Sequence, residues 1–354
     1  MSPLAQNKKR QFLRAAAATL ALGAALATPA LAQAETPVRF QLDWRFEGPS
    51  AFFLLPAAKG YFKAEKLAVT VDAGNGSGAA VTRVASGSYD IGFADLAALM
   101  EFHANNPTAP NKPVAVMMVY NNTPAAVFSL KKSGLKAPKD LAGKKLGAPV
   151  FDAGRKAWPI FDKANSVGKV EWISMDPPLR ETMLAKGDVD AITGFYFTSL
   201  LNLEARGVKA EDVAVMPYPQ YGVRLYGNAI IVSEPFLKQN PEAVMAFLRA
   251  FSKGAKEVIA DPKAAIEFVK ARDGIINSEL ETRRLKLAID SSIATADARA
   301  EGFGEVNGPR LALMASQVAD AFATKGRIEP AAVWNGGFLP SAAERNIFVA
   351  TAKK

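Results

Sequence analysis

After residue 35, apolar and polar positions follow two patterns in turn. Short, nearly continuous apolar runs are typical of strands buried on both faces, and apolar residues recurring every three or four positions indicate one face of a helix. We predict strands at residues 38–42, 68–72, 90–93, 114–119, 145–148, 170–173, 191–193 and 229–232. We predict helices at residues 49–59, 78–85, 96–104, 154–164, 178–185, 197–205, 241–260, 262–271, 279–293 and 309–324. Strands separated by single helices pair in parallel through right-handed crossovers, so the pattern predicts an α/β fold.

Two stretches of this pattern occur twice. Residues 84–93 and 184–193 each close a helix with Gly, turn, and enter a strand through Asp. The strand–glycine loop–helix units at 74–81 and 147–161 form a second matching pair. Two matches in the same order predict two similar lobes, each with a mostly parallel sheet flanked by helices.

The end of the chain is mostly helical and holds too few strands for a sheet of its own. We therefore expect it to pack on the first lobe. This predicts lobe 1 from residues 33–122 and 229–354, and lobe 2 from residues 123–228. The chain would cross between them near Tyr120–Pro124 and Arg224–Asn228.

The first 32 residues have the three-part pattern of an export signal. A basic start is followed by an apolar run from Ala15 to about Ala27 and by Ala30-Leu31-Ala32, with small residues at the positions that specify cleavage. A membrane anchor is the alternative, but the run falls short of the ~20 residues that span a bilayer. We predict cleavage after about Ala32 and a periplasmic protein. Lys9-Arg10 leaves both the general secretory and the twin-arginine route open.

Composition removes several classes of site. The chain of 354 residues has no Cys, which excludes disulfides, thiolate metal sites and cysteine nucleophiles. Its single His, His103, lies at a helix end rich in Asn and Pro, where we expect a solvated cap rather than a base, and no metal site is predicted. Without the export signal, which holds four basic and no acidic residues, the formal net charge falls from +9 to +5. No basic stripe interleaved with aromatic residues points to nucleic acid.

The loop 74–79, Gly-Asn-Gly-Ser-Gly-Ala, follows a strand and opens a helix. Free backbone N–H groups there favour an anion or a carbonyl oxygen, which makes Ser77 and Gly78 candidate ligand contacts. The spacing also fits a dinucleotide fingerprint with Ala in the last position. A glycine-rich turn without any ligand, and an exported dinucleotide-dependent oxidoreductase, therefore both stay open as alternatives.

The segment after the first strand carries a second group of candidates, at the edge where open α/β sheets bind ligands. Trp44 or Phe46 could stack on a flat ligand, with Asp43 or Glu47 accepting hydrogen bonds. Equally, Trp44 could belong to the core and Glu47 could be a helix-capping charge. Asp95, after the third strand, is a further candidate ligand contact.

The second lobe and the crossing supply the remaining candidates. They are Phe151, Asp152, Arg155, Phe195, Tyr196 and Tyr226. Arg155 is the best single candidate for pairing with a carboxylate or sulfonate, because its guanidinium donates two parallel bonds; a surface ion pair is the alternative. Asp152 fits a helix N-cap better than a ligand contact. Tyr226 and Asn228 could equally be hinge packing.

An ordered set of motifs resembles one known family. The motifs are Gln41-Leu42-Asp43-Trp44, Ala58-Lys59-Gly60-Tyr61-Phe62-Lys63, Gly76-Ser77-Gly78, Ser86-Gly87-Ser88-Tyr89-Asp90-Ile91-Gly92 and Asn228–Leu248. Together they look like the nitrate/sulfonate/taurine and thiamine-pyrimidine group of periplasmic binding proteins. The resemblance implies a two-lobed, type II Venus-flytrap fold that is monomeric. It further implies delivery of a small solute to the membrane permease of an ABC importer, with neither catalysis nor a cofactor.

The resemblance also bears on the solute. The enzyme branch of the family uses an essential His and a Cys-rich motif, so a chain without Cys does not fit that branch. Sulfonate and nitrate binders favour small polar pockets, whereas this chain places several aromatic residues near the predicted crevice. We therefore expect an aromatic or heterocyclic solute such as a pyrimidine, with an organic anion such as a sulfonate or carboxylate as the other possibility.

Overall fold

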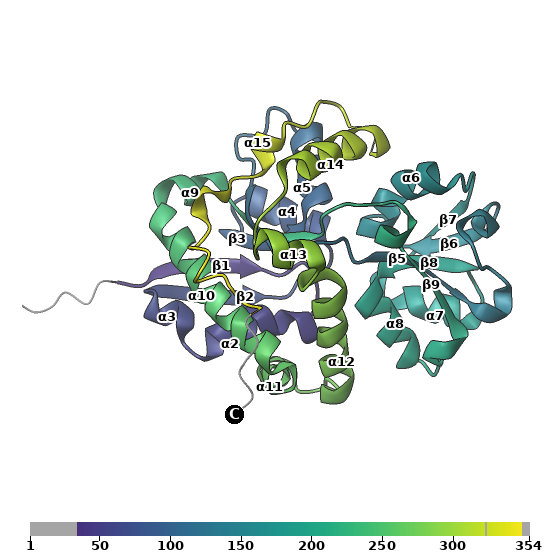
Figure 1. Cartoon of the computed structure of the whole chain (residues 1–354), viewed down its shortest axis with the longest axis horizontal. Helices are drawn as coiled ribbons and strands as arrows, with labels where there is room; N and C mark the ends of the chain where they lie inside the picture. Colours follow the sequence, from purple (N-terminus) through teal and green to yellow (C-terminus); the bar gives the residue numbers. More distant parts are fainter. Residues whose placement is uncertain (1–33, 323, 349–354) are drawn as a thin grey trace, which may run out of the picture. The chain divides into compact units, whose positions relative to one another are not determined.

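The computed structural model describes residues 34–322 and 324–348 (Figure 1). The predicted export signal lies outside the described residues. Within them, no helix is both long enough and apolar enough to cross a membrane.

The first sheet has five strands in the order β2-β1-β3-β10-β4. These are β1 (Thr36–Gln41), β2 (Leu67–Asp72), β3 (Ile91–Asp95), β4 (Val114–Met118) and β10 (Asn228–Val232). The strand β1 pairs in parallel with β2 and β3, whereas β10 is antiparallel to both β3 and β4. The reversal follows from the path of the chain, because β4 leads out to the second sheet and β10 leads back from it. We call this sheet and its helices lobe 1.

The second sheet repeats this arrangement in the order β7-β6-β8-β5-β9. Its strands are β5 (Ala125–Leu130), β6 (Lys145–Ala148), β7 (Glu171–Ser174), β8 (Ala191–Phe195) and β9 (Val213–Pro217). Again one strand, β5, is antiparallel to its two neighbours. Four of the five strands in each sheet thus share a direction, as expected for mostly parallel sheets. We call this sheet and its helices lobe 2.

The strand orders also test the two matches seen in the sequence. The strands β3 and β8 occupy equivalent places, so the match between residues 84–93 and 184–193 pairs equivalent units. The second match was wrong: the loop 74–81 follows β2, whereas 147–161 follows β6, the equivalent of β1. Glycine-rich turns recur wherever a strand meets a helix, and this one was not a sign of repetition.

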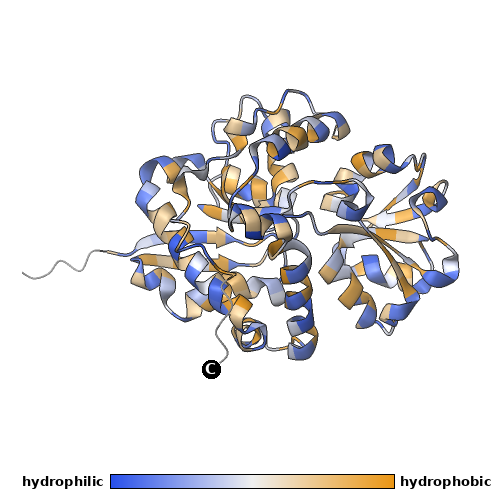
Figure 2. Ribbon diagram, in the orientation of Figure 1, coloured by the Kyte–Doolittle hydropathy of each residue, from blue (hydrophilic) through white to orange (hydrophobic). Residues whose placement is uncertain are grey.

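Helices cover both sheets. Lobe 1 carries α2 (Ala51–Ala58), α3 (Tyr61–Ala64), α4 (Ser77–Ala85), α5 (Leu96–Asn105), α9 (Glu234–Gln239), α10 (Pro241–Ala260), α11 (Pro262–Arg272), α12 (Ser278–Ala288), a π-helical turn at Ile289–Ile293, α13 (Ala296–Glu301), α14 (Gly308–Ala321) and α15 (Pro330–Val333). Lobe 2 carries α6 (Ala153–Asn165), α7 (Arg180–Lys186) and α8 (Tyr196–Glu204). Figure 2 shows apolar residues along the strands and polar residues over much of the helices' outer sides.

Stacked phenylalanines fix the late helix α10 to lobe 1. The ring of Phe40 on β1 lies 4.6 Å from Phe53 on α2 and 5.4 Å from Phe247 on α10, measured between centroids. Phe251, one turn further along α10, lies 5.0 Å from Phe53. Such pairs add to the burial of apolar area, which is the main stabilising contribution.

The two crossings between the lobes run side by side and are hydrogen-bonded to each other. The backbone N–H of Thr123 donates to the carbonyl of Leu225, and that of Gly227 donates to the carbonyl of Tyr120. A Cβ atom at Gly227 would lie 2.8 Å from the Cβ of Tyr120, so this close approach needs glycine. The crossings therefore form a short, defined connection rather than two independent linkers.

Candidate functional site

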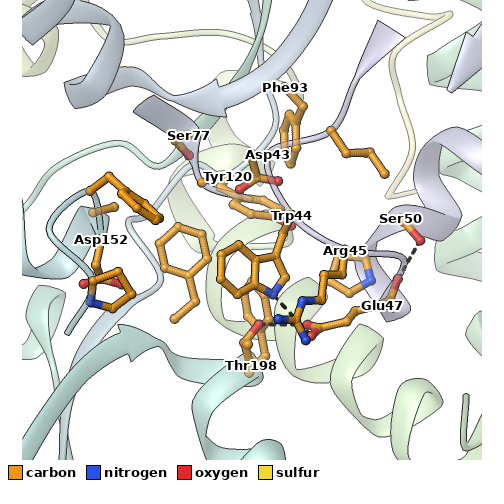
Figure 3. A pocket seen from close by; sticks show the side chains of 18 of the residues that line it. Asp43, Trp44, Arg45, Glu47, Ser50, Ser77, Phe93, Tyr120, Asp152 and Thr198 are labelled. Atoms are coloured by element: carbon orange, nitrogen blue, oxygen red, sulfur yellow. Dashed lines mark hydrogen bonds between the residues drawn. The ribbon is translucent and has the colours of Figure 1, made fainter. Parts of the chain in front are cut away.

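A cavity lies at the edge where the strands of both lobes end (Figure 3). Lobe 1 supplies the turn that follows β1, the loop before α4, and side chains from β3 and the first crossing. Lobe 2 supplies the turn before α6, the end of β8, the start of α8 and one residue of α7. Figure 3 shows Asp43, Trp44 and Glu47 on one side of this cavity and Asp152 on the other.

Seven of the residues selected from the sequence line this cavity. They are Asp43, Trp44, Glu47, Ser77, Phe151, Asp152 and Phe195. Gly78 and Asp95 line an adjoining second cavity, and Phe46, Arg155, Tyr196 and Tyr226 line neither. Sequence reasoning missed several lining residues, namely Arg45, Phe53, Phe93, Tyr120, Arg180, Phe197 and Thr198.

Asp43 presents a carboxylate that forms no ion pair with any residue in the described part of the chain. Its Oδ2 accepts a hydrogen bond of 2.7 Å from the amide nitrogen of Asn228, the first residue of β10. Burial raises the pKa of Asp43 to about 7, and the bond from Asn228 offsets only part of that effect. A ligand that donates a hydrogen bond or carries positive charge would stabilise the ionised form.

Glu47, on the cavity wall of lobe 1, accepts hydrogen bonds from residues of both lobes. Its Oε1 accepts a bond of 3.3 Å from the indole N–H of Trp44, and its Oε2 accepts one of 3.2 Å from the hydroxyl of Thr198 on α8. The guanidinium of Arg284 on α12 lies 3.5 Å from the same Oε2. Burial raises the pKa of Glu47, against the opposing effect of Arg284. The Glu47 side chain makes no helix-capping bond, and Trp44 is half-buried on the cavity wall rather than in the core.

The cations that line the cavity are Arg180 and Arg45. Arg180 is buried, and its guanidinium donates to Asp152 at 3.0 Å and to Glu181 at 2.9 and 2.8 Å. Asp152 also accepts from the hydroxyl of Thr193 at 2.8 Å. Arg45 is exposed, with its guanidinium carbon 5.8 Å from the centre of the Trp44 ring. The buried positive charge of the cavity wall is thus already matched by carboxylates.

The glycine-rich loop uses its amides within the protein. The N–H of Gly74 donates to the carbonyl of Trp44 at 2.9 Å, and that of Gly76 to the carbonyl of Asp43 at 2.7 Å. A Cβ atom at Gly74 would lie 2.0 Å from the carbonyl oxygen of Leu42. These glycines therefore allow two loops to pack closely, and the two amides are not free to cradle the phosphates of a dinucleotide.

Arg155 faces away from the cavity. Its guanidinium donates to the carbonyl of Ala148 and to the hydroxyl of Ser174, both at 3.0 Å, and lies 4.8 Å from the centre of the Trp172 ring. Its backbone N–H donates to Asp152, which is therefore the N-cap of α6 as well as a cavity residue. Among the described residues Arg155 forms no ion pair, so the surface ion pair considered from the sequence is absent too.

The other selected residues have local roles. The guanidinium of Arg272 lies 5.1 Å from the ring centre of Phe46, and Tyr196 packs against the core of lobe 2. The hydroxyl of Tyr226 accepts from the backbone of Asn307, and Arg310 on α14 lies over its ring. Tyr226 thus packs at the crossing.

His103 was misassigned as a solvated cap. It is half-buried, and its Nε2 hydrogen-bonds the carbonyl of Pro113 at 2.8 Å. The apolar surroundings of α5 bring the ring inward, a contact between distant residues that the local Asn and Pro content did not signal. Within residues 34–322 and 324–348, no three His, Cys, Asp or Glu side chains converge to hold a metal ion.

Comparisons with known proteins agree with this architecture. The family model described as NMT1/THI5 like matches residues 49–265. The 4-amino-5-hydroxymethyl-2-methylpyrimidine phosphate synthase of Aspergillus parasiticus is 27% identical over 241 residues, spanning 65% of this chain and 69% of that protein. The riboflavin-binding protein of Chloroflexus aurantiacus is 27% identical over 255 residues, spanning 71% of this chain and 70% of its own length.

Among solved structures, the alkanesulfonate-binding protein of Xanthomonas axonopodis pv. citri, bound to MOPS, superposes with a TM-score of 0.66. The alignment covers 86% of this chain and 99% of that one, at 14% identity. Similarity at this identity establishes the fold alone. Two five-stranded sheets flanked by helices are those of a type II periplasmic binding protein, which confirms the fold class expected from the sequence.

Proposed function

Because this chain belongs to the NMT1/THI5-like family, we propose that it is a solute-binding protein that holds a flat, nitrogen-containing heterocycle between its lobes. We further propose that it is exported and delivers this solute to the membrane permease of an ABC importer. One observation carries the choice of solute: the cavity is aromatic, and its charges favour a hydrogen-bond donor over an anion.

Aromatic side chains from both lobes border the cavity. Trp44 and Tyr120 come from lobe 1, and Phe151, Phe195 and Phe197 come from lobe 2. Offset stacking and edge contacts with a flat ring contribute about 0.5–1.5 kcal/mol per pair beyond the burial of area. A heterocycle between them would therefore be bound by both lobes at once.

The polar groups of the cavity are mainly acceptors. Among residues 34–322 and 324–348, Asp43 forms no ion pair, Glu47 keeps a raised pKa despite Arg284, and Arg180 is matched by Asp152 and Glu181. A sulfonate or nitrate would meet these carboxylates without a free buried cation in return, and a buried unpaired charge is costly. A ring bearing N–H or NH₂ groups would instead supply the donors that these oxygens lack.

The sequence relatives fit this solute class. One is the synthase of a pyrimidine phosphate, and another is a riboflavin-binding protein. The alkanesulfonate-binding protein shares the fold at lower identity. As to catalysis, the single His of the chain bonds the Pro113 carbonyl outside the cavity, and the chain has no Cys. These facts support binding rather than synthesis of a pyrimidine.

Isothermal titration calorimetry tests the proposal. We expect 4-amino-5-hydroxymethyl-2-methylpyrimidine or riboflavin to bind at least about tenfold more tightly than taurine or MOPS, a difference of ~1.4 kcal/mol. Asp43→Asn should remove most of this preference, whereas Asp188→Asn, in an exposed turn of lobe 2, should leave it unchanged. Tighter binding of the sulfonates would contradict the proposal.

A further inference from the structure

A second cavity of about 110 Å³ adjoins the first, several times the volume that one water needs. The two share Ser77, Phe151 and Ala153 in their walls. Phe151 is 42% exposed, and its ring lies against Gly76 of lobe 1. Phe151 is the largest of the three side chains that the two cavities share.

A buried carboxylate lines the second cavity. Asp95 is 4% exposed and caps α5, its Oδ1 accepting from the N–H groups of Ala97 at 2.9 Å and Ala98 at 3.3 Å. Its Oδ2 forms no hydrogen bond with the described residues, and this atom is not fully buried. Burial raises the pKa of Asp95 to about 7, the largest cause being desolvation. An acceptor on a side chain this deeply buried is stabilised by a donor placed in the cavity in front of it.

An ion pair between the lobes also lines this cavity. Lys156 on α6 donates to Glu101 on α5 at 2.7 Å, and both line the cavity. An added Cβ at Gly78, which lines the cavity, would meet nothing within 4 Å. The cavity is thus bounded by both lobes, has room beside Gly78, and is lined by a carboxylate oxygen, Oδ2 of Asp95, that accepts no hydrogen bond from the described residues.

We propose that the second cavity is a subsite for a short arm of the solute that ends in a primary amine or a hydroxyl, while the solute's ring occupies the first cavity. The arm passes Phe151 and donates to Oδ2 of Asp95. This inference rests on the proposed function and narrows it, from a flat heterocycle to one that carries a donor-bearing side arm. An amine binds more tightly than a hydroxyl, because a charge-assisted bond to a carboxylate is the stronger one.

A matched series of 4-amino-2-methylpyrimidines provides the test. The compounds carry hydrogen, ethyl, 2-hydroxyethyl or 2-aminoethyl at ring position 5, and calorimetry gives their affinities for the wild-type protein. We expect 2-aminoethyl to bind at least about tenfold more tightly than ethyl, with 2-hydroxyethyl between them. Asp95→Asn should abolish this order while leaving the ethyl compound unaffected, because Asn is also a good N-cap and keeps α5 intact.

Two further variants complete the design. Gly78→Leu fills the space beside the helix start and should weaken the armed compounds without affecting the unsubstituted ring. Asp290→Asn, an exposed position outside both cavities, should change nothing.

The outcomes separate the two proposals. If the unsubstituted ring binds but the arms add no affinity, or if Asp95→Asn retains the preference for the amine, the subsite is wrong and the proposed function stands. If no compound of the series binds the folded wild-type protein and the sulfonates do, the proposed solute class is wrong and the subsite with it.

Discussion

Two buried arginines flank the cavity, and they differ in what they connect. Arg180 on α7 bonds Asp152 and Glu181, which belong to its own lobe. Arg284 on α12 of lobe 1 bonds Glu281 at 2.9 Å, and it also donates to backbone carbonyls of α8 in lobe 2, including that of Thr198 at 3.0 Å. The first network lies within one lobe; the second joins the two.

The carboxylates beside these two arginines, Glu181 and Glu47, have pKa values shifted in opposite directions. Burial acts to raise the pKa of Glu181, but Arg180 and the hydroxyl of Ser199 outweigh it, and the pKa is lowered. At Glu47, burial outweighs Arg284, and the pKa is raised. The shortest distances account for part of this, 2.8 Å for Arg180 to Glu181 against 3.5 Å for Arg284 to Glu47. The network inside lobe 2 is therefore electrostatically satisfied, whereas the one between the lobes retains an incompletely matched carboxylate on the cavity wall.

This difference assigns the two arginines separate tasks. Rotation of one lobe against the other leaves the bonds of Arg180 in place and breaks those of Arg284 to α8. We expect Arg180 to stabilise a lobe and Arg284 to favour the arrangement in which the lobes are together. The predictions below test this separation.

The largest effect is expected for Arg180→Met. The substitution leaves Asp152 and Glu181 buried without a cation, and removing one partner of a buried pair costs about 3–5 kcal/mol. Urea unfolding monitored by circular dichroism measures the loss. Arg206→Met, which removes an exposed arginine of the same lobe, is the control and should cost less than about 1 kcal/mol. Equal losses for both variants would contradict a stabilising role for Arg180.

The next prediction concerns the affinity for the solute. It compares arginine-to-lysine substitutions, which keep the positive charge. Arg284→Lys retains a cation near Glu281 and Glu47, but an ammonium cannot reproduce the forked bonds to the carbonyls of α8. We expect the affinity for the heterocycle to fall about tenfold, ~1.4 kcal/mol, in calorimetry. Arg180→Lys should lower the affinity less than Arg284→Lys does, because the ammonium keeps the charge on the cavity wall and the partners of Arg180 do not join the lobes.

An exposed pair between the same two helices sharpens this test. Arg283 on α12 bonds Glu204 on α8. Surface pairs contribute only about 0–1 kcal/mol, so Arg283→Met should alter affinity less than Arg284→Lys. If it alters affinity more, the exposed pair rather than Arg284 holds the lobes together.

The elements around these arginines show which features could be predicted from sequence. Helix α10 and strand β6 were predicted with their observed bounds, because a Pro at the first helical position and a local apolar pattern mark them. The strands β5 and β9 were missed. In β5, Ala-Ala-Val-Phe-Ser-Leu is buried throughout, and this apolar run after Pro124 was a usable signal. In β9 the apolar run Val-Ala-Val-Met is short, ends at a Pro and lies between two short helical turns, so the local pattern did not distinguish it from a loop.

The cavity was harder to predict than the fold. Strand ends in a parallel sheet meet at one edge, which placed Asp43, Trp44 and Phe151 at the cavity. Arg155 was selected for its chemistry, but its side chain turns back to the Ala148 carbonyl and Trp172. Arg180, by contrast, lies beside Glu181 in a stretch that reads as exposed helix, and its burial depends on contacts with Asp152, 28 positions away. Such partners cannot be identified before the fold is known.

A smaller effect is expected for the pH dependence of stability, through Asp43 on the cavity wall. The folded-state pKa of Asp43, about 7, exceeds its ordinary value of 3.8, so the folded protein binds more protons than the unfolded chain between those values. The contribution of Asp43 to stability is therefore most favourable at low pH and declines as the pH rises through 7. From pH 5 to pH 8, the free energy of unfolding of Asp43→Asn should rise by about 1 kcal/mol relative to that of the wild type. The effect is no larger because water in the cavity moderates the cost of the charge. Unfolding curves at the two pH values measure the change, and a constant difference between the proteins would refute the assignment.

The smallest effect is expected in the radius of gyration from X-ray scattering. A ligand shifts the equilibrium toward joined lobes only through contacts made to both lobes, and the aromatic residues of the cavity come from both. Saturating heterocycle should therefore reduce the radius of gyration of the wild-type protein, with the backbone change concentrated at the crossings 120–124 and 224–228. Without solute, Arg284→Lys should have a larger radius than the wild type, since it lacks the bonds to α8, and Arg180→Lys should match the wild type. Identical radii for all three proteins, with and without solute, would mean that the lobes do not separate in solution, and that Arg284, like Arg180, serves only to stabilise the fold.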